Sequence, residues 1–141
     1  MLRNFNRGCT KNSTGETIRE NLPLEDTMIL YRPVGTKELE LIKRTGYCEF
    51  PPRLPEQPIF YPVLNEQYAT EIASGWNVKY NDDHKGYVTK FEVDDDYCKQ
   101  FEIHQVGGER HKELWIPAEK LKEFNEHIIG KINVISEFSD D

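Results

Sequence analysis

The sequence is short of basic residues, and this shortage excludes one class of partner. Its 141 residues include 18 Lys and Arg against 25 Asp and Glu, which gives a formal net charge of -7. Broad electrostatic binding to DNA, RNA or anionic lipid requires a basic surface. We therefore expect no broad nucleic-acid binding, although this composition still allows a local basic pocket.

Long apolar runs are also missing. No apolar stretch approaches the roughly 20 residues needed to cross a bilayer, and the N-terminal region lacks the apolar middle of a signal peptide. Cys9, Cys48 and Cys98 are odd in number and widely spaced, which is more typical of reduced thiols than of a disulfide framework or a CxxC metal site. We therefore expect a cytoplasmic protein with no membrane association.

The common nucleotide-binding motifs do not occur either. The sequence contains neither G-x-G-x-x-G nor a P-loop, so a Rossmann cofactor site and a Walker-type phosphate cradle have no support. Any nucleotide site in this chain must therefore use another architecture.

Hydrophobic patterning divides the chain into two parts. Residues 1–27 show no apolar periodicity, and we predict a flexible N-terminal extension there. Residues 28–141 are predicted to form a single domain, because a chain of this length can bury most of its apolar surface around one core. The patterns predict strands at 28–32, 59–61, 86–93, 101–106, 109–116 and 132–138, and helices at 36–44, 65–76 and 118–129. This β-α-β-α-β-β-β-α-β order favours an α+β fold over a doubly wound parallel sheet.

The strands at 101–106 and 109–116 form a predicted hairpin. Gly107-Gly108 suits the positive φ angles of a tight turn, so that Glu102 would face Glu113 and His104 would face His111. One face of the hairpin then carries polar and aromatic side chains that a purely structural hairpin does not require, namely Glu102, His104, His111, Glu113 and Trp115.

This hairpin face supports three interpretations. Two opposed carboxylates repel, so Glu102 and Glu113 would have separated pKa values or be held by a cation or substrate, as in an active site. Trp115 beside them offers a stacking surface for a heterocycle. The second interpretation is an ordinary solvated sheet face. The third is a metal site that uses His104, His111 and one glutamate, although the helical H-E-x-x-H spacing is absent.

Three stretches, in this order, resemble the signature strands of the ADP-ribosyltransferase superfamily, which includes the poly(ADP-ribose) polymerases. They are LYRPVG at 30–35, IFY at 59–61 followed by the helix at 65–76, and ELWI at 113–116. The sequence from about residue 29 to 138 is also similar to small bacterial proteins labelled as ADP-ribosylation or crystallin-like. The resemblance implies an ADP-ribosyltransferase-like split sheet, mixed or antiparallel, with flanking helices, and it implies NAD as substrate.

The resemblance also implies roles for individual residues. Arg32 would anchor NAD by its ribose or phosphate, and Tyr61 would pack on nicotinamide. Glu113 would be catalytic, because its carboxylate stabilises the positive charge that develops as nicotinamide departs. The remaining implied positions are Gly35, Phe60 and Trp115 as NAD-binding residues and Arg53, Glu102, His104 and His111 as accessory residues.

Two departures from the family pattern refine this expectation. His111 stands two residues before Glu113, where arginine-modifying relatives carry a second Gln or Glu, so modification of arginine is disfavoured. Pro33 removes a backbone donor near the position where relatives often use glycine to bind the nicotinamide amide.

The sequence thus predicts an NAD-dependent ADP-ribosyltransferase, or a related enzyme of ADP-ribose chemistry, with an unknown acceptor. Its expected partner is a nucleotide-like small molecule. The first alternative is a catalytically inactive module that binds a nucleotide or ADP-ribose or mediates an interaction. The second is a metal-dependent hydrolase that uses His104, His111 and Glu113.

Overall fold

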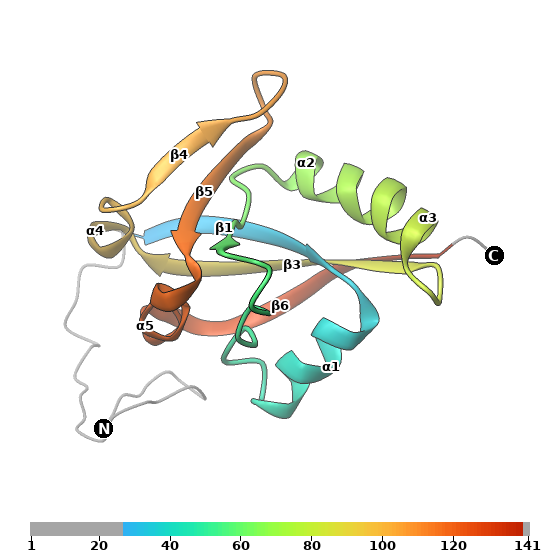
Figure 1. Ribbon diagram of the computed structural model, residues 1–141, viewed down its shortest axis with the longest axis horizontal. Coiled ribbons are helices and arrows are strands. Elements are labelled where there is room, and N and C mark those ends of the chain that lie inside the picture. Colours follow the sequence, from blue (N-terminus) through green and yellow to red (C-terminus); the bar gives the residue numbers. More distant parts are fainter. Residues whose placement is uncertain (1–26, 140–141) are drawn as a thin grey trace.

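The computed structural model describes residues 27–139, which form two three-stranded antiparallel sheets with helices around them (Figure 1). The first sheet has the order β1-β3-β6, with strands Thr27–Val34, Lys85–Asp94 and Ile128–Ser139. The second has the order β2-β5-β4, with strands Ile59–Phe60, Lys112–Pro117 and Glu102–Gln105. The predicted α+β class is confirmed. The extension predicted at 1–27 lies outside the described residues except for Thr27, the first residue of β1.

The helical segments lie on the sheet faces and at the strand connections (Figure 1). They are α1 (Thr36–Arg44), the continuous run of α2 (Glu66–Glu71), the π-helix η3 (Ile72–Asn77) and α3 (Val78–Tyr80), then α4 (Asp95–Cys98), the 3-10 turn η4 (Ala118–Lys120) and α5 (Leu121–Glu126). Within residues 27–139, none of the helices has both the length and the apolar content needed to span a bilayer.

Strand β1 extends further than the sequence predicts. The prediction ends it before Pro33, yet Pro33 pairs with Val88 and the strand continues to Val34. Backbone N–H groups two residues apart point to the same edge of a strand, and the Tyr31 N–H points away from β3, toward Val63. The N–H that proline lacks would also point away from β3, so Pro33 costs the β1–β3 ladder no hydrogen bond.

The two sheets are joined through the short segment around Val63. Val63 forms bridges with Tyr31 of β1 on one side and with Glu113 of β5 on the other. Its N–H donates to the Tyr31 carbonyl at 2.7 Å, and its carbonyl accepts from the Tyr31 N–H at 2.9 Å. The Leu114 N–H donates to the Pro62 carbonyl at 2.9 Å. These bonds place β1 and the start of β5 on either side of Val63.

The helix that follows β2 begins as predicted but continues further. Asn65 caps it, because its side-chain oxygen accepts the Tyr68 N–H at 3.0 Å. Ala69 and Ala73 are fully buried, in agreement with the predicted packed face. The prediction fails at Trp76, which periodicity places on that face but which is 61% exposed. The i→i+5 bonding of η3 shifts the side chains that follow relative to an α-helix.

The β4–β5 hairpin has a longer turn than predicted. His104 pairs with Glu113 and Glu102 with Trp115, so the predicted opposition of Glu102 and Glu113 is wrong. The Val106 N–H donates to the His111 carbonyl at 2.9 Å and closes a loop in place of a two-residue turn. Gly107 and Gly108 do not have the positive φ angles that the tight turn predicts, and a Cβ at Gly107 would lie 2.5 Å from the His111 ring nitrogen, so that the ring would have to move.

The last helix and strand share a different boundary from the predicted one. Helix α5 ends at Glu126, and β6 already begins at Ile128. Gly130, predicted as the helix stop, lies inside β6 with a φ of 75°. Its positive φ allows the register shift between β3 and β6 at this point and does not end a helix.

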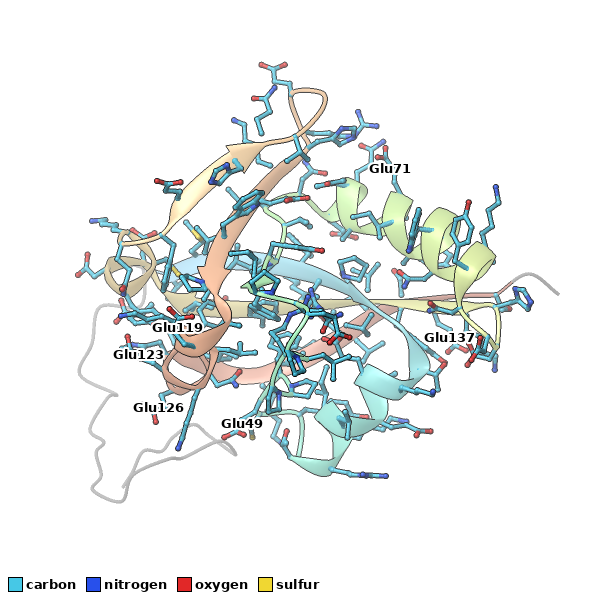
Figure 2. All side chains as sticks on the ribbon, in the orientation of Figure 1. Glu49, Glu71, Glu119, Glu123, Glu126 and Glu137 are labelled. Carbon is cyan, nitrogen blue, oxygen red and sulfur yellow. The ribbon has the colours of Figure 1, made fainter. Side chains whose placement is uncertain are left out.

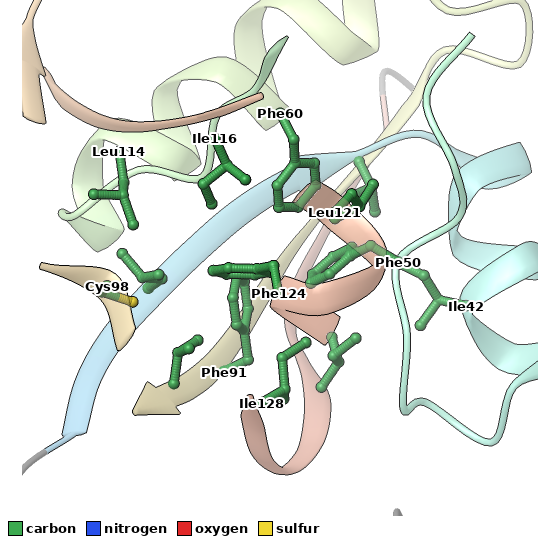
Figure 3. Close-up of a cluster of buried hydrophobic side chains, with 14 of the residues drawn as sticks. Ile42, Phe50, Phe60, Phe91, Cys98, Leu114, Ile116, Leu121, Phe124 and Ile128 are labelled. Carbon is green, nitrogen blue, oxygen red and sulfur yellow. The ribbon is translucent and has the colours of Figure 1, made fainter. Parts of the chain in front are cut away.

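The core contains four phenylalanines in mutual contact (Figure 3). Phe50 lies 4.8 Å from Phe91 and 5.2 Å from Phe60, and Phe124 lies 5.7 Å from Phe60, all between ring centroids. Leu114 and Ile116 of β5 and Leu30 of β1 belong to the same cluster. Because each sheet contributes to it, this apolar cluster stabilises their relative placement.

The cysteines differ from the expectation of three reduced thiols. Cys98 is free and buried in the core, and burial raises its pKa to about 12. Cys48 is disulfide-bonded.

Candidate functional site

One cleft of about 610 Å³ collects residues from distant parts of the sequence. Arg32, Tyr61 and Glu113 all line this cleft, together with the predicted positions Gly35 and Arg53. Its volume is within the range of small-molecule and cofactor sites. The other predicted positions, Phe60, Trp115, Glu102, His104 and His111, are not among its lining residues, so the structure separates the predicted set into two groups.

Arg32 is buried at the wall of the cleft and is held by a neighbouring carboxylate. Its Nε donates to Glu38 Oε2 at 2.7 Å, and one terminal nitrogen donates to Glu38 Oε1 at 3.1 Å. Its guanidinium also lies 4.8 Å from the centre of the Phe60 ring. Glu38 on α1 therefore takes two of the five N–H donors that Arg32 could otherwise offer to a phosphate.

Glu113, near the start of β5, is held by two uncharged donors. The Tyr68 hydroxyl donates to its Oε2 at 2.7 Å, and the Trp115 Nε1–H donates to its Oε1 at 2.9 Å. Burial, followed by the bond to Glu113, raises the pKa of Tyr68, which keeps the phenol protonated as a donor. The carboxylate is thus fixed in place without a paired cation among the described residues, and it can stabilise positive charge on a ligand.

The two predicted aromatic residues have different environments. Phe60 is 1% exposed and belongs to the core beneath Arg32, whereas Tyr61 is 43% exposed and lines the cleft. Arg53 is near Tyr61, with its guanidinium carbon 5.9 Å from the ring centre, and its Nε donates to the Ile59 carbonyl at 3.2 Å. Burial, then repulsion from Arg32, lowers the pKa of Arg53.

Trp115 contacts Glu113 through its edge and His104 through its face. The His104 ring stacks on it with 3.8 Å between centroids and 18° between planes. Glu102 holds the His104 ring in this position, because its Oε1 lies 2.9 Å from His104 Nε2. One face of Trp115 is therefore covered, and its hydrogen bond to Glu113 is its direct contribution to the site.

His111 belongs to a contact between the hairpin tip and α2. Its Nε2 lies 3.1 Å from Glu71 Oε1, and Arg110 also pairs with Glu71. Figure 2 shows Glu71 on α2 near the tip of the β4–β5 hairpin. His111 also lies 4.6 Å from Tyr68, between ring centroids. His111 thus supports the residue that holds Glu113.

The metal-dependent alternative requires three ligands around one point. Within the described part of the chain, no group of three or more His, Cys, Asp or Glu side chains is arranged to hold a metal ion. His104 and His111 instead contact Trp115 and Glu71, respectively. This alternative therefore lacks the ligand cluster on which it depends.

Three residues of the site were not predicted from the sequence. Glu38 was expected only to favour the start of α1, and Tyr68 and Trp76 only to pack the helix. Glu38 could have been predicted from Arg32, because an arginine at the end of a buried strand requires a carboxylate partner. No sequence signal locates the π-helix that exposes Trp76.

The described geometry is a cleft with a buried cation, an exposed tyrosine and a carboxylate on facing elements. These side chains come from β1, from the segment after β2 and from β5. No protein-family model matches the chain, and no curated protein or solved structure matches it at a significant level.

Proposed function

We propose that this chain binds NAD in the cleft and transfers ADP-ribose from it to an acceptor. The observation that carries the proposal is the convergence of Arg32, Tyr61 and Glu113 on one cavity of about 610 Å³. The split pair of antiparallel sheets is compatible with an ADP-ribosyltransferase-like fold, and β1 and β5 would supply the cation and the acid.

The transfer requires one bond to break and one to form at the anomeric carbon of the nicotinamide ribose. The C–N bond to nicotinamide breaks, and its electron pair leaves with the ring, which departs neutral. The positive charge that develops on the ribose is stabilised by the Glu113 carboxylate. The acceptor then forms a bond to this carbon and releases a proton. Tyr61, exposed at the cleft, would stack on the departing ring.

The contacts of Glu113 support this role. Its donors, Tyr68 and Trp115, are uncharged and oriented by the fold, so the carboxylate needs little reorganisation as the ribose becomes positive. The cleft also holds Arg53, whose guanidinium retains donors beyond the one bonded to Ile59. Arg53 is thus better placed than Arg32 to donate hydrogen bonds to a phosphate.

The test measures NAD binding by calorimetry and nicotinamide release with water as the acceptor, using the full chain. Glu113→Gln should retain the fold and weak NAD binding but lower nicotinamide release about 100-fold or more, because it removes a charge that acts in the transition state. Glu109→Gln is the matched control, since Glu109 is exposed on the same hairpin and is not among the residues that line the cleft. Equal release by wild type and Glu113→Gln would remove Glu113 from the mechanism.

A second candidate is a module that binds ADP-ribose or a nucleotide without turnover. Two observations favour it: Glu38 already engages Arg32, and Pro33 offers no backbone donor beside it. Saturable binding of NAD and ADP-ribose with no nicotinamide release would support this candidate over the enzyme.

A further inference from the structure

Trp76 is an exposed aromatic residue that lines the cleft and takes no part in the hydrophobic core. It is 61% exposed, although large aromatic side chains stabilise a fold mainly when they are buried. It lines the same cleft as Tyr61 and Glu113. Behind it, the Tyr80 ring lies 4.4 Å away, between centroids, at an angle of 45°. Trp76 is thus an exposed aromatic surface supported by a second ring.

The backbone around Trp76 accounts for this exposure. Trp76 lies in the π-helix η3, and single π turns inside α-helices occur often at functional sites. The residue three positions earlier, Ala73, remains fully buried against the first sheet. The irregular turn therefore anchors the helix while turning Trp76 to the cleft.

Positive charge accompanies the two exposed aromatics of the cleft. Tyr61 and Trp76 come from different segments, and Lys37 and Arg53 line the same cavity. Two aromatic surfaces with cations in one cavity match a ligand that has a ring at each end and an anionic middle. A dinucleotide has this chemistry, whereas a mononucleotide would occupy one aromatic surface and leave the other unused.

The wall beside Trp76 is polar. Asn77, the next residue, and Asn81 both line the cleft. Amide side chains can donate and accept hydrogen bonds, so this wall fits a nucleobase better than a hydrocarbon chain.

We propose that Trp76 is the stacking surface for the adenine base of the dinucleotide, at the opposite end from the nicotinamide ring on Tyr61. This inference rests on the proposed function, because it assigns the second ring of the same ligand. Stacking of a base on an aromatic side chain changes Kd by roughly 5- to 150-fold, so a change on the order of tenfold is expected for Trp76.

The two tryptophans of the chain, Trp76 and Trp115, allow a direct measurement. A Trp115→Phe variant leaves Trp76 as the only tryptophan. Adenosine monophosphate and NAD should each quench its emission in a saturable manner, whereas nicotinamide mononucleotide should not. If NAD binds by calorimetry while Trp76 emission stays unchanged, the stacking assignment is overturned.

Substitution of Trp76 provides the second measurement. Trp76→Ala should weaken NAD binding about 10-fold or more and leave nicotinamide mononucleotide binding unchanged, and Trp76→Phe should restore part of the affinity. Ile103→Ala is the control, because Ile103 is an exposed apolar residue of β4 outside the cleft lining. Equal weakening of both ligands by Trp76→Ala would place Trp76 at the nicotinamide end and overturn the proposal.

The outcomes separate this inference from the function on which it rests. If wild-type protein neither binds NAD nor releases nicotinamide, the proposed function fails and the adenine subsite fails with it. If wild type binds NAD and Trp76→Ala binds it equally well, the function stands and the adenine subsite is wrong.

Discussion

At the scale of single residues, the candidate acid depends on neighbours that are distant in sequence. Glu113 accepts one bond from Tyr68, which is 45 positions away, and one from Trp115, which is two positions away. The second bond follows from strand geometry, since residues two apart point to the same face. The first requires α2 to lie beside β5, which no local pattern encodes.

Tyr68 is expected to act as a positioning residue for Glu113. Tyr68→Phe removes one of the two donors that hold the Glu113 carboxylate in position. The maximal rate of nicotinamide release should fall roughly 10-fold or more, because a hydrogen bond to a charged group contributes about 1.5–3 kcal/mol, while KM changes little.

Tyr80→Phe is the control for this prediction, because Tyr80 is an exposed tyrosine at the end of the same helical run. A Tyr68→Phe variant with an unchanged maximal rate, or with KM and rate altered equally, would show that the phenol does not position Glu113.

At the scale of elements, the contact between β3 and the π-helix controls the wall that carries Trp76. Gly86 of β3 lies against this helix so closely that an added Cβ would meet the Ala73 carbonyl oxygen at 2.4 Å and the Asn77 Cβ at 2.6 Å. The Ala73 oxygen is backbone and cannot move aside without moving η3. Gly86 is therefore required by space.

Gly86→Ala should lower the free energy of unfolding by about 1–3 kcal/mol, the usual effect of inserting a methyl group into a packed site. Denaturant unfolding followed by circular dichroism measures this change. Gly75→Ala is the matched control in the neighbouring helix, since its Cβ would meet nothing within 4 Å, and its stability should stay the same or rise. Equal stability of the two variants would contradict the close packing of β3 on η3.

Comparison of the predicted and observed elements shows which sequence signals are sufficient to predict local structure. The cap at Asn65 and the buried face of Leu39 and Ile42 were predicted, because capping and helical periodicity act over a few residues. The hairpin register was wrong because it assumed a two-residue turn at Gly107, where the structure has a longer loop. Trp76 was placed inward because a regular helical period was extended through a π-helical turn.

At the scale of the whole molecule, the candidate site lies between two sheets that meet at Val63. Arg32 follows the residue of β1 that pairs with Val63, and Glu113 pairs with Val63 from β5. The approach of cation and acid is thus a result of tertiary assembly. For this reason the sequence could name both residues, through their resemblance to a family pattern, but could not show that they share a cavity.

A ligand that contacts both sheets should stabilise this junction. NAD at about 100 times its Kd should raise the free energy of unfolding by about 2.7 kcal/mol. The amide hydrogens of Tyr31, Val63 and Leu114 should exchange more slowly when NAD is bound, because these amides donate the bonds across the junction. Hydrogen exchange read by NMR measures both effects, with the Thr45 amide of α1's end as an internal reference. Stabilisation without slower exchange at the junction would mean that the ligand contacts one sheet alone.

The Val63 junction has a consequence for how the active geometry could be lost. Val63→Pro would remove the backbone N–H that donates to the Tyr31 carbonyl. The Val63 side chain is apolar and supplies neither the cation nor the acid. The cation and the acid would keep their own local partners, Glu38 and Tyr68, while the spacing between them would no longer be set. Loss of activity would then begin at an apolar residue whose substitution leaves every charged group of the cleft in place.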